Sequence, residues 1–197
     1  MAPSDSELWL RVRGGDAEAF GVLFERHART IYNYCFRRLG DWAAAEDLVS
    51  VVFLEAWRRR DQALPPGKVV PWLYGIATNV VRNRRRSLLR YAAALRRVAP
   101  PPAETGFADD ADARLDDERE MRSALALVRT LPRREQEVLA LCGWFELTYE
   151  DAGLALGIPI GTVRSRLSRA RSRLRELAVA GGHEEEGRQR IGEALGR

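Results

Sequence analysis

The sequence predicts an all-α protein made of two small helical domains, a helical bundle and a helix-turn-helix domain, joined by a flexible acidic linker. Apolar residues recur at helical spacing along the 197 residues, and no segment shows the two-residue alternation of strands. Three consecutive prolines at 100–102 break any helix and precede an acidic stretch that is poor in apolar residues. Residues 148–177 read as a helix, a sharp turn and a second, arginine-rich helix.

The first domain is predicted to span residues 5–97. Helical periodicity indicates one or two helices over 17–39 and a further helix over 42–60. Residues 62–70 contain two prolines and a glycine and therefore predict a loop. Pro71 suits the first turn of a third helix, because an N–H at that position would have no helical partner.

The linker is expected over residues 98–117, the second domain over 118–180 and a disordered tail over 181–197. In the second domain, a helix near 117–130 is expected to lead to Pro132, which begins the next helix. The helix-turn-helix follows.

The ends of the helix-turn-helix carry recognisable signals. Thr148 and Asp151 resemble a capping box, with Asp in place of the usual Glu or Gln. Gly157 is expected to end the first helix, and Pro159 cannot continue it. Thr162 is expected to cap the second helix with its hydroxyl.

The second helix has the pattern of a DNA major-groove reader. Residues 162–175 contain six arginines and no acidic residue. The apolar residues share one narrow face: Val163, Leu167, Ala170, Leu174 and Leu177. The opposite face holds Ser165, Ser168, Arg169 and Ser172, with Arg164 and Arg171 on one flank and Arg166 and Arg173 on the other. Short polar groups and one arginine would face the bases, and the flanking arginines would face the phosphates. The alternative is a solvated amphipathic helix, but such helices usually mix both signs of charge.

A second basic segment without acidic residues lies in the first domain. Residues 62–97 contain eight basic and no acidic residues, whereas residues 98–161 are acidic overall. The chain as a whole has a net charge of +4. Two separate basic segments indicate two contacts with a polyanion rather than a uniformly basic surface.

The helix that begins at Pro71 is expected to divide into a core face and a nucleic-acid face. The core face holds Leu73, Ile76, Ala77 and Val80, and the opposite face holds Gly75, Thr78, Asn79, Arg82, Arg85 and Arg86. Small, hydroxyl, amide and guanidinium groups let a nucleic-acid backbone approach closely and accept hydrogen bonds. Trp72 and Tyr74, beside the preceding loop, are expected to receive an unstacked base. A solvated face is the alternative, but it does not explain the lack of acidic residues.

The helix over residues 45–59 has more apolar residues than one buried face needs. Leu48, Val49, Val52, Phe53 and Ala56 form the expected core face, and Asp47, Ser50, Val51, Leu54 and Arg58 lie opposite. Exposed Val51 and Leu54 flanked by charge favour a docking patch for a partner protein. A helix buried on both sides, or isolated surface hydrophobes, would also fit.

The sequence offers no constellation for catalysis or for metal binding. We find no nucleophile–base pair, no paired carboxylates with a site around them and no Gly-rich phosphate loop, so we expect no enzymatic activity, no cofactor and no metal. Cys35 and Cys142 stand alone and are expected to be reduced core residues in the cytoplasm. No apolar run predicts a membrane span, and the N-terminus lacks the pattern of a secretory signal.

Taken together, these segments resemble an extracytoplasmic-function (ECF) RNA polymerase sigma factor of the sigma-70 family. The motifs AEDLV…F, PWL…IA.N and GTVRSRLSRAR occur in this order across a short acidic linker, and this combination is highly specific. Residues 14–59 resemble the start of sigma region 2, residues 71–86 its promoter-melting end, and residues 131–174 sigma region 4.

The resemblance implies a dissociable subunit that directs promoter-specific transcription initiation. Its implied partners are core RNA polymerase (clamp helices and flap), promoter DNA and a separate anti-sigma factor, with no membrane. The implied polymerase-binding residues are Asp47, Ser50, Val51 and Leu54. Those implied to melt the minus-10 element are Trp72, Tyr74, Thr78, Asn79, Arg82, Arg85 and Arg86, with Asn79 the best candidate to capture a flipped base. Those implied to read the minus-35 element are Thr162, Arg164, Ser165, Arg166, Ser168, Arg169, Arg171 and Arg173.

Two departures from the family pattern carry expectations. Ser50-Val51 stands where the family usually has Gln-Glu, so the clamp contact is expected to be less polar. Ala152-Gly153 stands where a large aliphatic residue and Ala are common, so we expect this helix to be less stable by about 1 kcal/mol or more. Two other functions stay open: a helix-turn-helix regulator that does not join polymerase, and a sigma-like adaptor that does not melt DNA.

Overall fold

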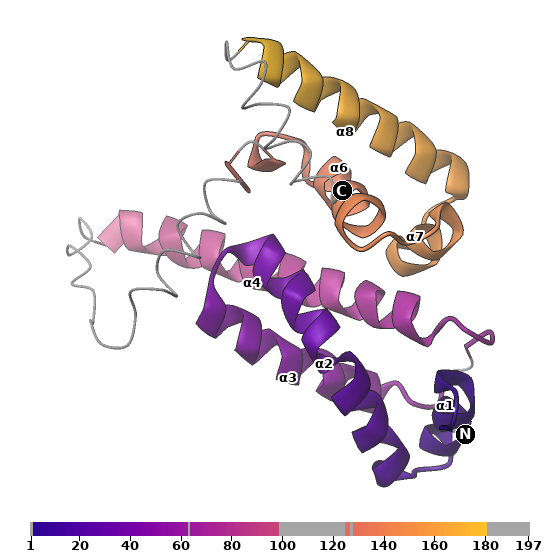
Figure 1. Cartoon of the computed structure of the whole chain (residues 1–197). Helices are drawn as coiled ribbons and strands as arrows, with labels where there is room; N and C mark the ends of the chain where they lie inside the picture. Colours follow the sequence, from indigo (N-terminus) through magenta and orange to yellow (C-terminus); the bar gives the residue numbers. More distant parts are fainter. Residues whose placement is uncertain (1, 63, 99–124, 127, 181–197) are drawn as a thin grey trace.

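The computed structural model describes residues 2–62, 64–98, 125–126 and 128–180, and every regular element among them is helical, which confirms the all-α prediction. The first group of helices is α1 (Asp5–Arg13), α2 (Ala17–Leu39), α3 (Trp42–Arg58) and α4 (Val69–Val98). The second group is α6 (Arg133–Leu139), η1 (Ala140–Trp144), α7 (Tyr149–Leu156) and α8 (Ile160–Ala180). Figure 1 shows the second group resting on the α4 side of the first.

Short polar side chains begin the first three helices. Asp16 and Asp41 accept a backbone N–H at the starts of α2 and α3, and Gly40 ends α2 with a positive φ of 66°. Helix α1 is absent from the sequence-based prediction, although Ser4 and Glu7 form a complete capping box at its start. The 17–39 segment is one helix rather than two.

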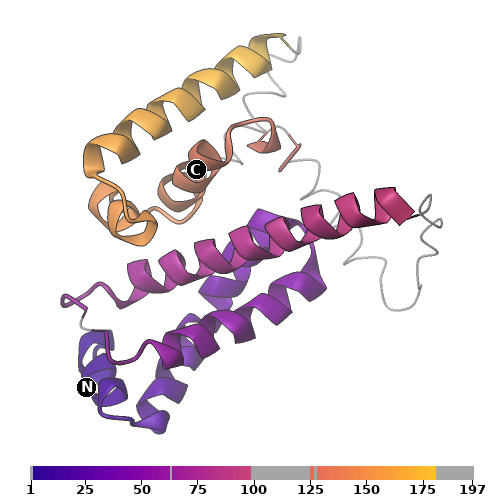
Figure 2. The same cartoon turned by 180° about the vertical axis from the view of Figure 1, so that it is seen from behind.

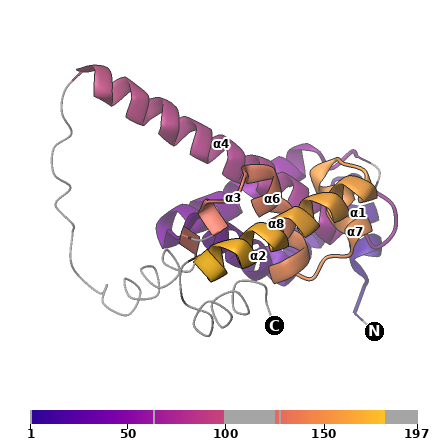
Figure 3. The same cartoon turned by 90° about the horizontal axis from the view of Figure 1, so that it is seen from above.

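The core of the first domain lies between α2, α3 and α4, with α1 covering one end (Figure 2). Leu23 and Ile31 from α2, Val52 from α3, and Leu73 and Val81 from α4 are almost completely buried. Val80, predicted to be a core residue, is only half-buried. Helix α4 is longer than the body of its domain, and its second half projects past the other helices (Figure 3).

The second domain packs α6, η1, α7 and α8 around its own apolar residues. The helix expected from Pro132 ends as an α-helix at Leu139 and continues as one wide π turn, η1, to Trp144. Most of the helix expected near 117–130 lies outside the described residues, as do the linker at 99–117 and the tail at 181–197. The domain limits stay predictions.

Candidate nucleic-acid interface

The turn between α7 and α8 brings two backbone segments into close contact. Thr148 accepts the N–H of Asp151 at 3.1 Å, as its capping role predicts. Gly157 ends α7 with a φ of 64°, and the Ile158 N–H donates to the Gly153 carbonyl at 3.0 Å. A Cβ on Gly153 would lie 2.9 Å from the Ile158 carbonyl oxygen. The tight turn therefore leaves no room for a side chain at this position, and the expected lower stability of the helix stays a prediction.

Helix α8 starts at Ile160, three residues before the start that capping by Thr162 predicts. Thr162 therefore lies inside the first turn, and its backbone N–H donates to the Pro159 carbonyl at 2.9 Å. The predicted capping role of Thr162 is wrong for this reason.

The two faces of α8 separate as predicted. Val163, Leu167, Ala170 and Leu174 are buried, but Leu177, near the end of α8, is 38% exposed. Ser165, Ser168 and Arg169 are exposed on the opposite face. The outward surface of α8 thus presents short hydroxyls around one guanidinium.

The arginines that flank this face have different surroundings. Arg164 and Arg171 are exposed, and the Arg164 guanidinium lies 5.7 Å from the centre of the Tyr149 ring. Arg166 is half-buried. Arg173 donates to both carboxylate oxygens of Glu135 on α6. The pairing of Arg173 is a contact that spacing along the chain does not predict.

The predicted docking patch on α3 is exposed. Asp47 and Ser50 lie at the surface, and the side chains of Val51 and Leu54 are 41% and 57% exposed. The neighbouring core residues Leu48, Val49 and Val52 are buried beneath them. An exposed apolar surface of this kind is typical of a protein-binding site.

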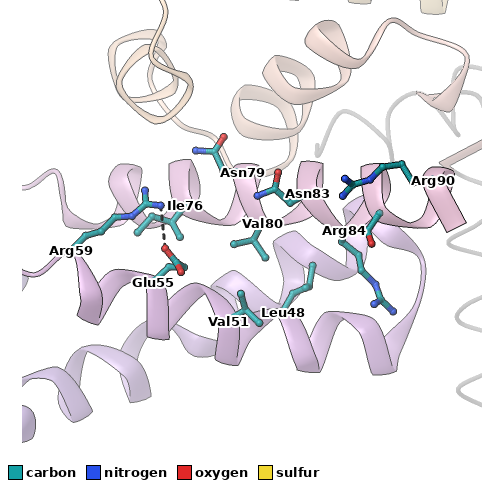
Figure 4. A pocket seen from close by; sticks show the side chains of 11 residues that line it. Leu48, Val51, Glu55, Arg59, Ile76, Asn79, Val80, Asn83, Arg84 and Arg90 are labelled. Carbon is teal, nitrogen blue, oxygen red and sulfur yellow. Dashed lines mark hydrogen bonds and ion pairs between the residues drawn. The ribbon is translucent and has the colours of Figure 1, made fainter.

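A groove between α3 and α4 joins the patch to the basic face of α4. Its volume is about 480 Å³, with Leu48, Val51, Ile76 and Val80 on its apolar side. Figure 4 shows the Glu55–Arg59 ion pair at one end and Arg84 with Arg90 toward the other. Asn79 and Asn83 also line it. The groove therefore combines an apolar floor with a mainly basic rim.

The predicted nucleic-acid face of α4 is only partly open. Asn79 and Arg86 are exposed, and Trp72 is half-buried with its indole N–H 3.2 Å from the Gln62 side-chain oxygen. Thr78 and Tyr74, expected at the surface, are 2% and 3% exposed, so that expectation is wrong.

The second domain covers this part of α4. The Tyr74 ring packs against Tyr34 of α2 and Phe145 of the second domain, with ring centres 5.3 and 5.4 Å away. The hydroxyl oxygens of Thr78 and Tyr34 lie 2.7 Å apart and form a hydrogen bond. Burial raises the pKa of both tyrosines, so their hydroxyls stay neutral.

Ion pairs cross the surface between the two domains, which we call the seam. The Arg82 guanidinium donates from Nε and Nη2 to the two oxygens of Glu137, each at 2.6 Å, and these hydrogen bonds raise the pKa of Arg82. The Lys68 ammonium lies 2.8 Å from Oδ1 of Asp151. These partners are more than fifty residues apart, so no local sequence signal reveals them.

Close backbone contact accompanies these pairs. A Cβ on Gly75 of α4 would lie 2.6 Å from the carbonyl oxygen of Ala155 on α7. Gly75 is therefore the point where α7 lies directly on α4.

Arginines gather at the other end of the seam. An open cavity of about 600 Å³ is lined by Arg85, Arg129 and Arg133 together with leucines, and none of its described lining residues is acidic. Burial, together with the nearby charges of Arg38, Arg129 and Arg133, lowers the pKa of Arg85 to about 10. Arg85 also donates to the Arg38 carbonyl at the end of α2. Like charges repel one another at this end, while Arg129 also donates across the seam to the Leu39 carbonyl at 2.8 Å.

Comparison with known proteins identifies both domains. The family models of Sigma-70 region 2 and Sigma-70, region 4 match residues 23–91 and 121–174. The sigma factor CarQ of Myxococcus xanthus is 32% identical over 167 residues, which cover 85% of this chain and 93% of CarQ. The ECF sigma factor SigW of Bacillus subtilis is 30% identical over 172 residues, covering 84% and 92% of the two chains.

Solved structures show the same arrangement of helices. The sigma factor RpoE of Bartonella quintana, in complex with the anti-sigma factor NepR, has a TM-score of 0.60 and 27% identity, covering 80% of this chain and 95% of RpoE. CnrH in complex with the cytosolic domain of CnrY has a TM-score of 0.66 at 24% identity, covering 90% and 99%, and supports the fold alone. No helix among the described residues is long and apolar enough to cross a membrane. The chain therefore belongs to the sigma-70 family, as an RNA polymerase sigma factor of the ECF subfamily.

Proposed function

We propose that this sigma factor joins core polymerase in the cytoplasm through region 2 and region 4 and selects promoters by contacting DNA at two elements. The proposal rests on one observation: an exposed apolar patch, a basic face and an arginine-rich recognition helix occur on three different helices, α3, α4 and α8. Each surface can serve a different contact at the same time. Two weak DNA contacts on one chain reinforce each other, because the second occurs at high effective concentration.

The recognition helix is proposed to read the minus-35 element. Ser165, Ser168 and Arg169 would face base edges, since short hydroxyls and an exposed guanidinium suit the major groove. Arg164, Arg166 and Arg171 would contact phosphates on its flanks. Arg173 and Thr162 keep a place at the edge of this interface, Arg173 as a positioning residue through Glu135.

The basic face of α4 is proposed to hold the melted minus-10 element. Asn79 would hydrogen-bond an extruded base, and Arg82, Arg85 and Arg86 would contact phosphates. Trp72 offers an aromatic surface beside the loop. Tyr74 and Thr78 would reach DNA only after the second domain moves off α4, since both are buried now.

The patch on α3 is proposed to dock on the polymerase clamp helices through Asp47, Ser50, Val51 and Leu54, while region 4 contacts the flap. A separate anti-sigma factor would compete there, and the groove between α3 and α4 suits an amphipathic helix with acidic residues. The protein itself would supply no catalysis.

Run-off transcription tests the proposal. Purified protein added to core polymerase on a genomic promoter library should produce defined start sites, and permanganate should detect unpaired thymines at minus-10. Pull-down of DNA without polymerase would favour a stand-alone regulator. Defined binding without unpaired thymines would favour a sigma-like adaptor.

A further inference from the structure

The open cavity at the arginine end of the seam has the size and the charge of a ligand site. Its volume of about 600 Å³ falls in the range of small-molecule sites and far exceeds that of a single phosphate ion. The end of α2 and the middle of α4 line it from the first domain, and the segment that leads into α6 lines it from the second. A ligand bound there would contact both domains.

The arginines of this cavity hydrogen-bond to neutral oxygens. Arg85 donates to the Arg38 carbonyl and, at 3.4 Å, to the side-chain oxygen of Gln136. Arg129 donates to the Leu39 carbonyl at 2.8 Å. Carbonyl and amide oxygens carry only partial negative charge, and none of the described lining residues is acidic. The described part of the cavity therefore does not neutralise its guanidinium groups.

Helix α6 supplies a carboxylate to other arginines but not to Arg85. The residues on either side of Gln136 are glutamates, and each of them holds an arginine of another helix by two hydrogen bonds. Gln136 is 5% exposed, and its Nε2 donates to the Leu131 carbonyl at 2.8 Å, which leaves its oxygen toward Arg85. At the cavity the helix thus offers an uncharged amide.

The positive charges act on one another. Arg38 is 4% exposed, and its Nε is buried without a hydrogen-bond partner in the part of the chain that the structure describes. Burial, together with the charges of Arg38, Arg129 and Arg133, lowers the pKa of Arg85 to about 10. Arg85 remains charged at neutral pH in surroundings that disfavour positive charge. A bound anion would reverse this effect, because it offsets the repulsion among the guanidinium groups.

Apolar side chains complete the cavity. Leu88 and Leu89 of α4 line it and are 49% and 55% exposed, and Leu131 lines it from the second domain. Guanidinium groups bind phosphate oxygens in pairs of parallel hydrogen bonds, and apolar walls accept an organic group attached to the phosphate. Three lining arginines with a fourth close by match more negative charge than one phosphate carries.

We propose that this cavity binds a polyphosphate group, either inorganic or carried by a nucleotide, through Arg85, Arg129 and Arg133. The site is separate from the proposed contacts with polymerase, and its occupation does not require promoter DNA. Arg85 also belongs to the proposed minus-10 surface, so an occupied cavity withholds this guanidinium from the DNA backbone.

Isothermal titration calorimetry tests the site with the full-length protein, at fixed ionic strength and without polymerase or divalent cations. Sodium tripolyphosphate and ATP are the two probes. Arg133→Gln should weaken tripolyphosphate binding about tenfold, because it removes a charge-assisted contact. Arg134→Gln is the matched control, since it removes the same charge from the next exposed residue, which does not line the cavity. Equal weakening in both variants would show that binding follows net charge, and would overturn the proposal.

A second pair of variants adds charge instead of removing it. Leu88→Glu places a carboxylate at the cavity and should weaken tripolyphosphate binding about tenfold or more, because the carboxylate competes for the same guanidinium groups. Tyr91→Glu adds the same charge to α4 at a residue that is 65% exposed and does not line the cavity. Both positions are exposed, so circular dichroism should show an unchanged fold. Identical binding by these two variants contradicts the proposal.

The two probes distinguish the sources of the ligand. Tighter binding of ATP than of tripolyphosphate supports a nucleotide whose base packs on the leucines, and equal binding supports inorganic polyphosphate. Absence of binding by both probes overturns the proposal. If Arg133→Gln weakens binding of a single-stranded DNA but not of tripolyphosphate, the cavity serves nucleic acid and the proposal is wrong. Failure of run-off transcription with core polymerase would defeat the proposed function alone, because the titrations contain no polymerase.

Discussion

The Nη1 atom of Arg173 on α8 lies 2.8 Å from each carboxylate oxygen of Glu135 on α6. The side chain of Glu135 is 6% exposed, whereas that of Arg173 is 46% exposed. An arginine expected from the sequence to contact DNA therefore also fixes the recognition helix to its own domain. Substitution of Arg173 is therefore expected to remove a link between α8 and α6 as well as a positive charge.

Arg173→Ala should destabilise the protein, because it leaves a buried carboxylate without its partner. We expect a loss of about 1–3 kcal/mol in the free energy of unfolding, below that of a fully buried pair because solvent screens half of Arg173. Urea unfolding followed by circular dichroism measures it. Arg171→Ala, an exposed neighbour on the same helix, should change the unfolding free energy by less than about 0.5 kcal/mol. Equal losses in both variants would contradict the structural role of the pair.

Arg169→Ala and Arg171→Ala should differ in their effect on DNA binding. Arg169 lies on the outward face of α8 together with Ser165 and Ser168, so its loss should reduce discrimination between minus-35 sequences by roughly 1–3 kcal/mol. Arg171 lies on the flank, so its loss should weaken binding to all sequences and lower the salt slope by about one unit. Binding isotherms at several salt concentrations on cognate and random duplexes measure both. Identical changes on random DNA would remove the proposed division between bases and phosphates.

Local chemistry accounts for the part of the structure that the sequence predicted. The spacing of Val163, Leu167, Ala170 and Leu174 defines one helical face, and this face is buried as helical periodicity predicts. Val51 and Leu54 could be placed at the surface because the rest of α3 already supplies a complete core face. The end of α7 could be predicted from Gly157, because the residue that ends the helix has a positive φ and glycine adopts such a φ easily.

The prediction failed where a distant segment decided the outcome. Thr78 lies on the polar side of α4 by helical periodicity and Tyr74 near the preceding loop, but Phe145 packs on Tyr74 and α7 lies against this part of α4. Glycine has a low helix propensity, so the sequence alone does not explain its presence at position 153. The close approach of the Ile158 carbonyl explains why a residue without a side chain stands there. Periodicity describes one helix at a time and carries no information about which face a second domain will cover.

Leu54→Asp should abolish binding to core polymerase while the fold persists. Leu54 is 57% exposed on α3, so an aspartate there meets water in the free protein but would lose its hydration at an apolar interface. Co-elution with core enzyme on size exclusion measures the effect. Leu10→Asp is the matched control, since Leu10 is also exposed but lies on α1, away from the patch. Undiminished co-elution of Leu54→Asp would remove α3 from the docking surface.

Gly153→Ala and Gly161→Ala should shift stability in opposite directions. A methyl group at Gly153 meets the Ile158 carbonyl at 2.9 Å, so the turn must open, and we expect a loss of roughly 1 kcal/mol or more. At Gly161, in the first turn of α8, nothing lies within 4 Å of the added Cβ, and alanine should stabilise the protein by about 0.5–1 kcal/mol. Thermal unfolding distinguishes them, and stabilisation by Gly153→Ala would show that the turn adjusts freely.

Cys35 should make the protein less stable at alkaline pH. Burial raises the pKa of the Cys35 thiol from 9.0 to about 12, so the unfolded chain loses this proton while the folded protein keeps it. Stability from this group is complete below the unfolded pKa near 9 and falls as pH rises toward 12, by up to about 4 kcal/mol. The raised pKa values of Cys142, Tyr34 and Tyr74 act in the same direction. Urea unfolding under reducing conditions, at neutral pH and at about pH 11, measures the loss.

The variant Cys35→Ala isolates the contribution of this thiol to the loss of stability at alkaline pH. Alanine removes the titrating group and leaves a small cavity, so the variant should be somewhat less stable than wild type at neutral pH and lose stability less steeply as the pH rises. The same slope in both proteins would show that the Cys35 thiolate is accommodated in the core, either by water or by a nearby positive charge. Arg38 is the nearest candidate for such a positive charge, because it is buried three residues after Cys35 at the end of α2.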